Sequence, residues 1–286
     1  MKANRYIMLP EDWDELTEAD WQELLKMRQQ MVDKQLALTL SDVRIEAARI
    51  LLENRGMKTQ TGNQQYLILV SQLARSLDWL WKEQDGTLSL CYRSVLNKLP
   101  KIGEWTGPAD CGTDITFGEF RMAVAVLRNY EQHPSERDLN VLAGLLYRPE
   151  ASEQMQHEQQ LRRWPYDWDT FEQKERRGEQ MQRWQVWGVY AWFAYFCEAL
   201  TTATFILEGE EVCFAPLFEQ RDGGKGGERT GNGLQQICLT LAESHVFGTA
   251  RDVDHTLLLT VMQKLLLDYQ TLQRLKDNRL KMNKQG

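Results

Sequence analysis

The chain has 286 residues, of which 42% are hydrophobic and 26% charged, and this composition fits one large or two ordinary soluble domains with a substantial core. A net charge of −7 disfavours non-specific binding to DNA or RNA. Five cysteines without paired spacing, and an N-terminus without the apolar run of a signal peptide, predict a cytoplasmic protein.

Two octets share one helix-start pattern: DELTEADW at 14–21 and TDITFGEF at 113–120. Thr17 and Thr116 occupy the N-cap position, and a carboxylate follows three residues later at Asp20 and Glu119. We expect the second pair to form the better capping box, because Asp is a shorter substitute for Glu. Hydrophobic-staple positions are taken by Leu16 with Trp21 and by Ile115 with Phe120. Both octets therefore predict helix starts, each opening a helical module.

The rest of the first hundred residues also reads mainly as helix. Ser41 is expected to cap a second helix that Gly56 ends, and apolar spacing predicts a third helix over 64–82. The alternation in GTLSLCYR, 86–93, indicates a short strand or hairpin arm. The Pro- and Gly-rich stretch that follows breaks helical structure and is the best candidate for a boundary, so the N-terminal module is predicted to span 1–99.

In the second half, the helix starting at Thr116 is followed by one capped within HPSERD and ended by YRPE. Residues 184–207 are long and apolar enough to cross a bilayer, but Glu198 near the middle and aromatic residues throughout favour a buried helix. EGEEVCFAPLF, 208–218, is a strand or an irregular return, and the glycine-rich stretch 221–233 is a flexible loop.

The last predicted helix is long. Its apolar seam comprises Val253, Leu257, Val261, Leu265, Tyr269, Leu272 and Leu275. The elements together predict a mainly α fold with a multi-helix, bundle-like architecture. Two helical modules, 1–99 and 100–286, are expected, with a small β-hairpin element.

No pattern in the sequence predicts an enzyme, a cofactor or a metal site. The glycine loop lacks the first glycine and the Ser or Thr of a phosphate-binding loop, and the four histidines lack zinc-site spacing. Cys197 and Cys213 lie in apolar surroundings and are expected to be inert packing residues. An enzyme of unrecognised type, with a site assembled from distant residues, stays open as an alternative.

The segment 161–184 interleaves arginine with aromatic residues. This pattern suits plain packing, a protein-interface hot spot or stacking on single-stranded nucleic acid, and the sequence leaves all three open. The candidate partner-binding residues are Arg162, Arg163, Trp164, Tyr166, Trp168 and Trp184. Acidic residues balance the basic ones over this window, so it forms no basic stripe.

The order of several short phrases resembles a known group of proteins. These phrases are LPEDWDELT, NKLPKIGEWTGPAD leading to DITFGEF, LAGLLYRPE, and LAESHVFGTARDV before the final helix. The chain resembles tail-assembly-chaperone-like and related accessory proteins of tailed phages and prophages of Bacteroidetes-type bacteria.

This resemblance implies a cytoplasmic, non-enzymatic helical protein that holds an aggregation-prone structural partner, without a cofactor. The aromatic segment 164–196 and an acidic face around 11–23 would supply the apolar and solubilising surfaces that such work needs. The alternative from another class is a nucleic-acid-associated protein that uses the basic C-terminus or four arginines, Arg162, Arg163, Arg176 and Arg177.

Overall fold

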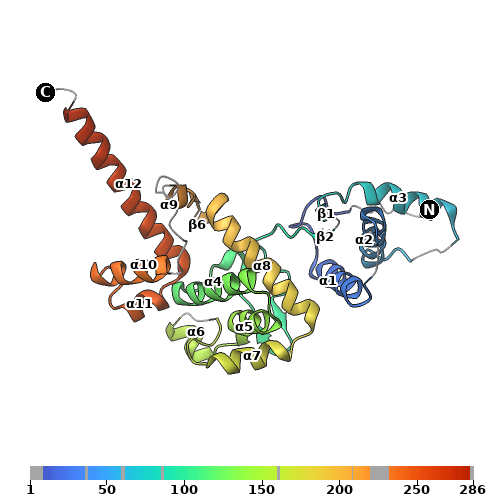
Figure 1. The fold of residues 1–286 in the computed structure, drawn as a ribbon, viewed down its shortest axis with the longest axis horizontal. Helices are drawn as coiled ribbons and strands as arrows, with labels where there is room; N and C mark the ends of the chain where they lie inside the picture. Colours follow the sequence, from blue (N-terminus) through green and yellow to red (C-terminus); the bar gives the residue numbers. More distant parts are fainter. Residues whose placement is uncertain are drawn as a thin grey trace.

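The computed structural model describes residues 9–35, 38–58, 62–84, 87–159, 162–207, 209–219 and 232–283. The described fold is mainly α with small antiparallel strand pairs, as the sequence predicts (Figure 1). No helix in these ranges is both long enough and apolar enough to span a bilayer.

The N-terminal part consists of three helices and a hairpin. These elements are α1 (Glu18–Asp33), α2 (Leu40–Asn54), α3 (Gln64–Arg75), β1 (Trp81–Gln84) and β2 (Thr87–Leu90). The predicted hairpin arm is confirmed as β2, but the first two residues of its partner β1, Trp81 and Lys82, were predicted to end the third helix. The helix ends early because Leu77, Leu80 and Trp81 are all buried where the chain turns into the hairpin.

The start of α2 also differs from its prediction. Thr39, two residues before the predicted cap Ser41, forms a complete capping box with Asp42. Gly56 follows the end of the helix with φ +81°, a left-handed conformation that favours glycine, as predicted.

The helix starts of the two octets are confirmed, but the expected ranking of their capping boxes is wrong. Thr17 and Asp20 form the complete box, whereas Thr116 accepts the backbone N–H of Glu119 without a reciprocal bond. The Glu119 side chain instead points into the interior, where it accepts hydrogen bonds from Arg148 and Arg163. The third residue of each helix is thus a fully buried carboxylate, because Asp20 is also buried.

The stretch after the hairpin, predicted as a module boundary, is well packed. It forms β3 (Lys101–Ile102) and β4 (Trp105–Thr106), which pair with β5 (Arg148–Pro149) from a later part of the chain. The buried Tyr147 hydroxyl donates to the Leu99 carbonyl at 2.6 Å. The predicted boundary at 99/100 therefore falls in a segment fixed by the second half of the chain, and the division into 1–99 and 100–286 stays a prediction.

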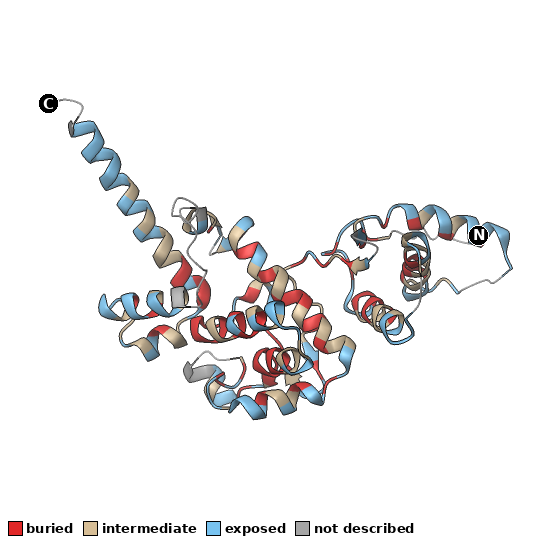
Figure 2. Ribbon diagram, in the orientation of Figure 1, coloured by how far each residue is buried: buried red, intermediate tan, exposed pale blue. Residues whose placement is uncertain are grey.

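The central body is built from helices around α8. Its helices are α4 (Phe117–Gln132), α5 (Glu136–Leu146), α6 (Glu153–Gln159), α7 (Phe171–Glu179) and α8 (Arg183–Thr202). Helices α5 and α7 cross at two glycines. A Cβ at Gly144 would lie 1.8 Å from the Lys174 carbonyl oxygen, and a Cβ at Gly178 would lie 2.1 Å from that of Asn140. Helix α8 contacts α4 and α5, and Figure 2 shows buried residues along much of its length.

The C-terminal part begins with a short hairpin and ends with the longest helix. Its elements are β6 (Thr204–Leu207), β7 (Glu210–Cys213), α9 (Pro216–Glu219), α10 (Asn232–Glu243), α11 (Ala250–His255) and α12 (Leu258–Asn283). The predicted apolar seam does not lie on one helix, because it is interrupted at Thr256, between α11 and α12. There the Phe117 N–H donates to the Thr256 carbonyl and the Leu258 N–H donates to the Ile115 carbonyl. Residues 221–231 of the predicted flexible loop lie outside the described residues.

Candidate partner-binding site

A buried ion cluster beneath the segment 162–168 determines the geometry of the candidate site. Glu119, in the first turn of α4, accepts from Arg148 at 2.8 and 3.1 Å and from Arg163 at 3.0 and 3.4 Å. All three side chains are buried. Burial alone would raise the pKa of Glu119, but the two guanidinium charges outweigh it, so the pKa lies below its ordinary value.

Arg148 of the same cluster also holds the backbone of the segment 162–168 in place. Arg148 donates from Nε to the Trp164 carbonyl at 2.7 Å, and Trp164 N–H donates to the Pro149 carbonyl at 3.0 Å. Two residues earlier, Ala151 N–H donates to the Arg162 carbonyl at 3.1 Å. The segment is therefore attached on both sides of Trp164, which gives this irregular stretch a rigid backbone.

Two tryptophans project from this rigid segment. Trp164 is 38% exposed and Trp168 is 57% exposed, and their ring centroids lie 5.8 Å apart with a tilt of 58°. We call these two residues the tryptophan pair. Large aromatic side chains held in one orientation lose little conformational entropy on binding, and they are enriched at the energetic centres of protein interfaces.

The six residues predicted from the sequence take four different positions. Trp164 and Trp168 face solvent, whereas Arg163 and Tyr166 are buried and hold the segment in place. Arg162 is half-buried and lies 3.6 Å from the Asp114 carboxylate. Trp184 lies on α8 at the contact with α1, where the Lys26 ammonium sits 5.3 Å from its ring centroid. Two of the six thus present an exposed aromatic surface at the segment itself.

The sequence analysis missed the anchoring role of Glu119 and Arg148. Glu119 was read only as a capping residue, and its arginine partners lie 29 and 44 residues further along the chain. The available signal was the arginine in YRPE, a charged residue immediately after a predicted buried helix. Such a residue requires an ionic partner if the chain around it is also buried.

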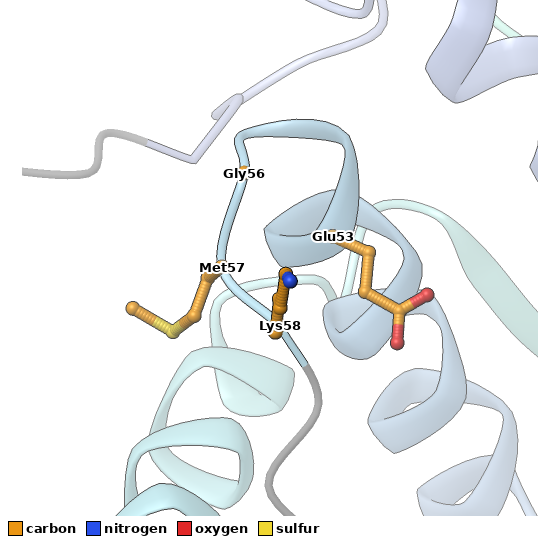
Figure 3. A pocket seen from close by; sticks show the side chains of 4 residues that line it. All are labelled: Glu53, Gly56, Met57 and Lys58. Carbon is orange, nitrogen blue, oxygen red and sulfur yellow. The ribbon is translucent and has the colours of Figure 1, made fainter.

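Two concave sites lie among the described residues. Beside Arg162 and Trp164 lies a cavity of about 30 Å³, which is the space of one water molecule. A second depression, after the end of α2, is lined by Glu53, Gly56, Met57 and Lys58. Figure 3 shows that the Met57 and Glu53 side chains point to opposite sides of this depression, with Lys58 between them.

Two findings bear on metal and thiol chemistry in the part of the chain that the structure describes. Its His, Cys, Asp and Glu side chains form no group of three or more suited to hold a metal ion. Burial raises the pKa of the Cys197 thiol well above its usual range, which makes a reactive thiolate unfavourable. His255 lies 3.4 Å from the Asp167 carboxylate and packs near the Tyr166 ring, beside the candidate site.

No protein-family model matches the chain, and no curated protein or solved structure shows significant similarity to it. The function is therefore argued from the chemistry and geometry of the described residues.

Proposed function

We propose that this protein is a non-enzymatic helical binding protein that holds a protein partner through the tryptophan pair. The observation that carries the proposal is the presentation of Trp164 and Trp168, exposed side by side, on a segment that the Glu119 cluster anchors. A soluble protein gains nothing in stability from exposed tryptophan, whereas an aromatic pair on a rigid support suits recognition of an apolar protein surface.

The nearby arginines favour a protein partner over nucleic acid, because most of them already lie beside carboxylates of the same chain. Arg163 is buried against Glu119, and Arg177 is paired with Asp169. Arg162 lies beside Asp114, so three of the four arginines named for nucleic-acid contact already have carboxylate neighbours. With a net charge of −7, the chain also lacks the overall field that draws phosphate backbones.

The sequence resemblance suggests the biological form of this binding. We propose an accessory or chaperone-like role in phage or prophage tail assembly, in which the protein holds an aggregation-prone structural subunit. Apolar contact through the tryptophan pair, together with the acidic character of the chain, would keep such a subunit in solution.

The test is co-expression with the products of the neighbouring genes, followed by co-purification. Replacing Trp164 and Trp168 together by alanine is expected to reduce partner recovery at least about tenfold, as for interface hot spots. The matched control is Ile206→Ala, because Ile206 is 76% exposed on β6, away from the Glu119 cluster. Circular dichroism establishes that both variants are folded.

Three results would contradict the proposal. The first is full retention of a partner by the folded double variant. The second is equal loss of the partner in the Ile206→Ala control. The third is binding that weakens steeply and linearly with the logarithm of salt concentration, which is the signature of phosphate contacts and would favour the nucleic-acid alternative.

A further inference from the structure

The outer part of α12 carries large apolar side chains that are exposed in the part of the chain that the structure describes. In Figure 1 the helix extends away from the body, and Figure 2 shows its outer turns as exposed. Leu258 and Val261, near its start, are buried in the body. Further along, large apolar side chains are more than half exposed, namely Leu267, Leu272, Leu275, Leu280 and Met282. A helix that continues its core stripe into solvent is suited to a second helix.

Three of these residues, Leu272, Leu275 and Met282, lie on a seam with the heptad spacing of a coiled coil, whereas Leu267 and Leu280 lie beside it. Alternating steps of three and four residues run through Leu258, Val261, Leu265, Asp268, Leu272, Leu275, Arg279 and Met282. Such spacing keeps one seam facing a partner helix along its whole length. The seam outside the body contains two charged residues, Asp268 and Arg279, of opposite sign. Charged residues at seam positions specify register and orientation.

We propose that the outer part of α12 pairs antiparallel with the same helix of a second copy of this chain. Placing Leu272 opposite Leu275 of the second copy puts Leu265, which is half-buried at the edge of the body, opposite Met282. In that same register Asp268 lies opposite Arg279. The two-fold symmetry repeats each layer, so both charged seam residues of each copy meet an opposite charge.

The parallel arrangement is disfavoured by the same two residues. It would place Asp268 against Asp268 and Arg279 against Arg279 in the seam, and like charges held this close destabilise a helix pair. The antiparallel register also avoids like charges on its flanks. It brings Tyr269 near Lys276 of the second copy and Thr271 near Asn278, a pair that carries no charge.

The geometry leaves room for both bodies. The register is centred between Gln273 and Arg274, so each body lies beyond the C-terminal end of the other copy's helix. The paired stretch 265–282 has 18 residues and is about 27 Å long. In the single chain Asp268 pairs with Lys264 on the helix surface, where both are partly exposed. Such a pair contributes little, so Asp268 can exchange it for Arg279 of the second copy.

The experiment measures the oligomeric state of the full chain by sedimentation over a concentration series. The wild-type protein is expected to dimerise, and Asp268→Arg or Arg279→Asp alone should raise the dissociation constant about tenfold or more. The two single variants mixed together should form a 1:1 heterodimer. The double variant should regain the wild-type affinity, because the charges are exchanged and still opposite.

Two charge reversals at residues of α12 that lie outside the seam serve as matched controls. Asp277→Arg and Lys281→Asp change the same charges outside the seam and should dimerise like the wild type. Lysine cross-linking then reports the orientation. Lys264 and Lys281 are 17 residues apart, about 26 Å within one helix, but they lie close together across the antiparallel pair.

A wild-type chain that stays monomeric up to its solubility limit would overturn the proposal, whatever else covers the stripe. A dimer whose affinity ignores the Asp268 and Arg279 reversals would overturn it equally. A cross-link pattern in which Lys264 joins only Lys264 of the other copy would show a parallel pair and would also reject it. Binding through the tryptophan pair is measured separately, so each proposal stands or fails by itself.

Discussion

At the scale of single residues, Glu119 is the side chain on which the candidate site depends. Its carboxylate has no exposure to water and pairs with two buried guanidinium groups, those of Arg148 and Arg163, of which Arg163 also lies 3.3 Å from the Asp114 carboxylate. Removing one member of a buried ion cluster leaves the others as uncompensated charges in a medium of low polarity, which costs far more than loss of a surface pair. The same residue decides whether Trp164 stays fixed, because Arg148 holds the Trp164 carbonyl.

We expect Glu119→Gln to lower the free energy of unfolding by about 3–5 kcal/mol, since the amide retains the shape but not the charge. Urea denaturation measures this loss. The matched control is Glu150→Gln, which removes an exposed pair with Lys101 and should leave stability near that of the wild type. Similar stability of the two variants would show that the cluster is not held together by charge.

The pH dependence of the free energy of unfolding tests the role of the Glu119 charge independently. The folded-state pKa of Glu119 lies below the ordinary value of 4.5, so its stabilisation is fully present above that pH. It is lost as the pH falls through the lower folded-state value. The stability difference between wild type and Glu119→Gln should therefore shrink in acid. A difference that stays constant from neutral pH into strong acid would contradict the ionised state of the cluster.

At the scale of elements, the sequence predicted local features well and long-range ones poorly. Thr17 and Thr116 cap their helices because capping depends on residues three positions apart. In contrast, residues 81–84 carry helix-compatible side chains and become strand only because 87–90 pairs with them. The exposed tryptophans were predictable as a motif, but their rigid support comes from residues such as Arg148, which no local pattern connects to Trp164.

The crossing of α5 and α7 provides the element-scale prediction. Alanine at Gly144 would place a Cβ against the Lys174 backbone, which cannot move without displacing α7. We expect Gly144→Ala to destabilise the protein by about 1–3 kcal/mol through overpacking, although alanine favours a helix more than glycine does. The comparison variant is Gly188→Ala in α8, because its Cβ would meet methyl groups of Leu25 and Leu99, which can shift.

Thermal unfolding of the two variants checks this order. The Gly144→Ala protein should melt clearly below Gly188→Ala. The reverse order would mean that the α5–α7 backbone contact is looser than the structure shows. Because α7 follows directly after the tryptophan pair, a weakened crossing should also reduce partner binding in the co-purification assay.

At the scale of the whole molecule, the N-terminal helices are attached to the central body through α8. The Arg28 guanidinium lies 3.6 Å from the Trp187 ring centroid, and the Tyr92 and Tyr195 rings meet edge to face at 6.2 Å. Burial lowers the pKa of Arg28 to about 10, which reflects how far this contact excludes water. These aromatic contacts, together with the hydrogen bond from the Tyr147 hydroxyl to the Leu99 carbonyl, connect the parts that the sequence predicts as separate modules.

These contacts predict how the two parts come apart. Arg28→Ala removes a desolvated cation–π contact of about 2 kcal/mol, which corresponds to an increase of more than tenfold in opening of the α1–α8 interface. Hydrogen exchange should accelerate by that factor in α1 and in the adjoining turns of α8, while α5 and α7 keep wild-type rates. Lys26→Ala is the control, because Lys26 lies further from its ring, 5.3 Å from the Trp184 centroid, and is partly exposed. If exchange accelerated equally in α5 and α7, the chain would open as one cooperative unit, and the prediction of two modules would be wrong.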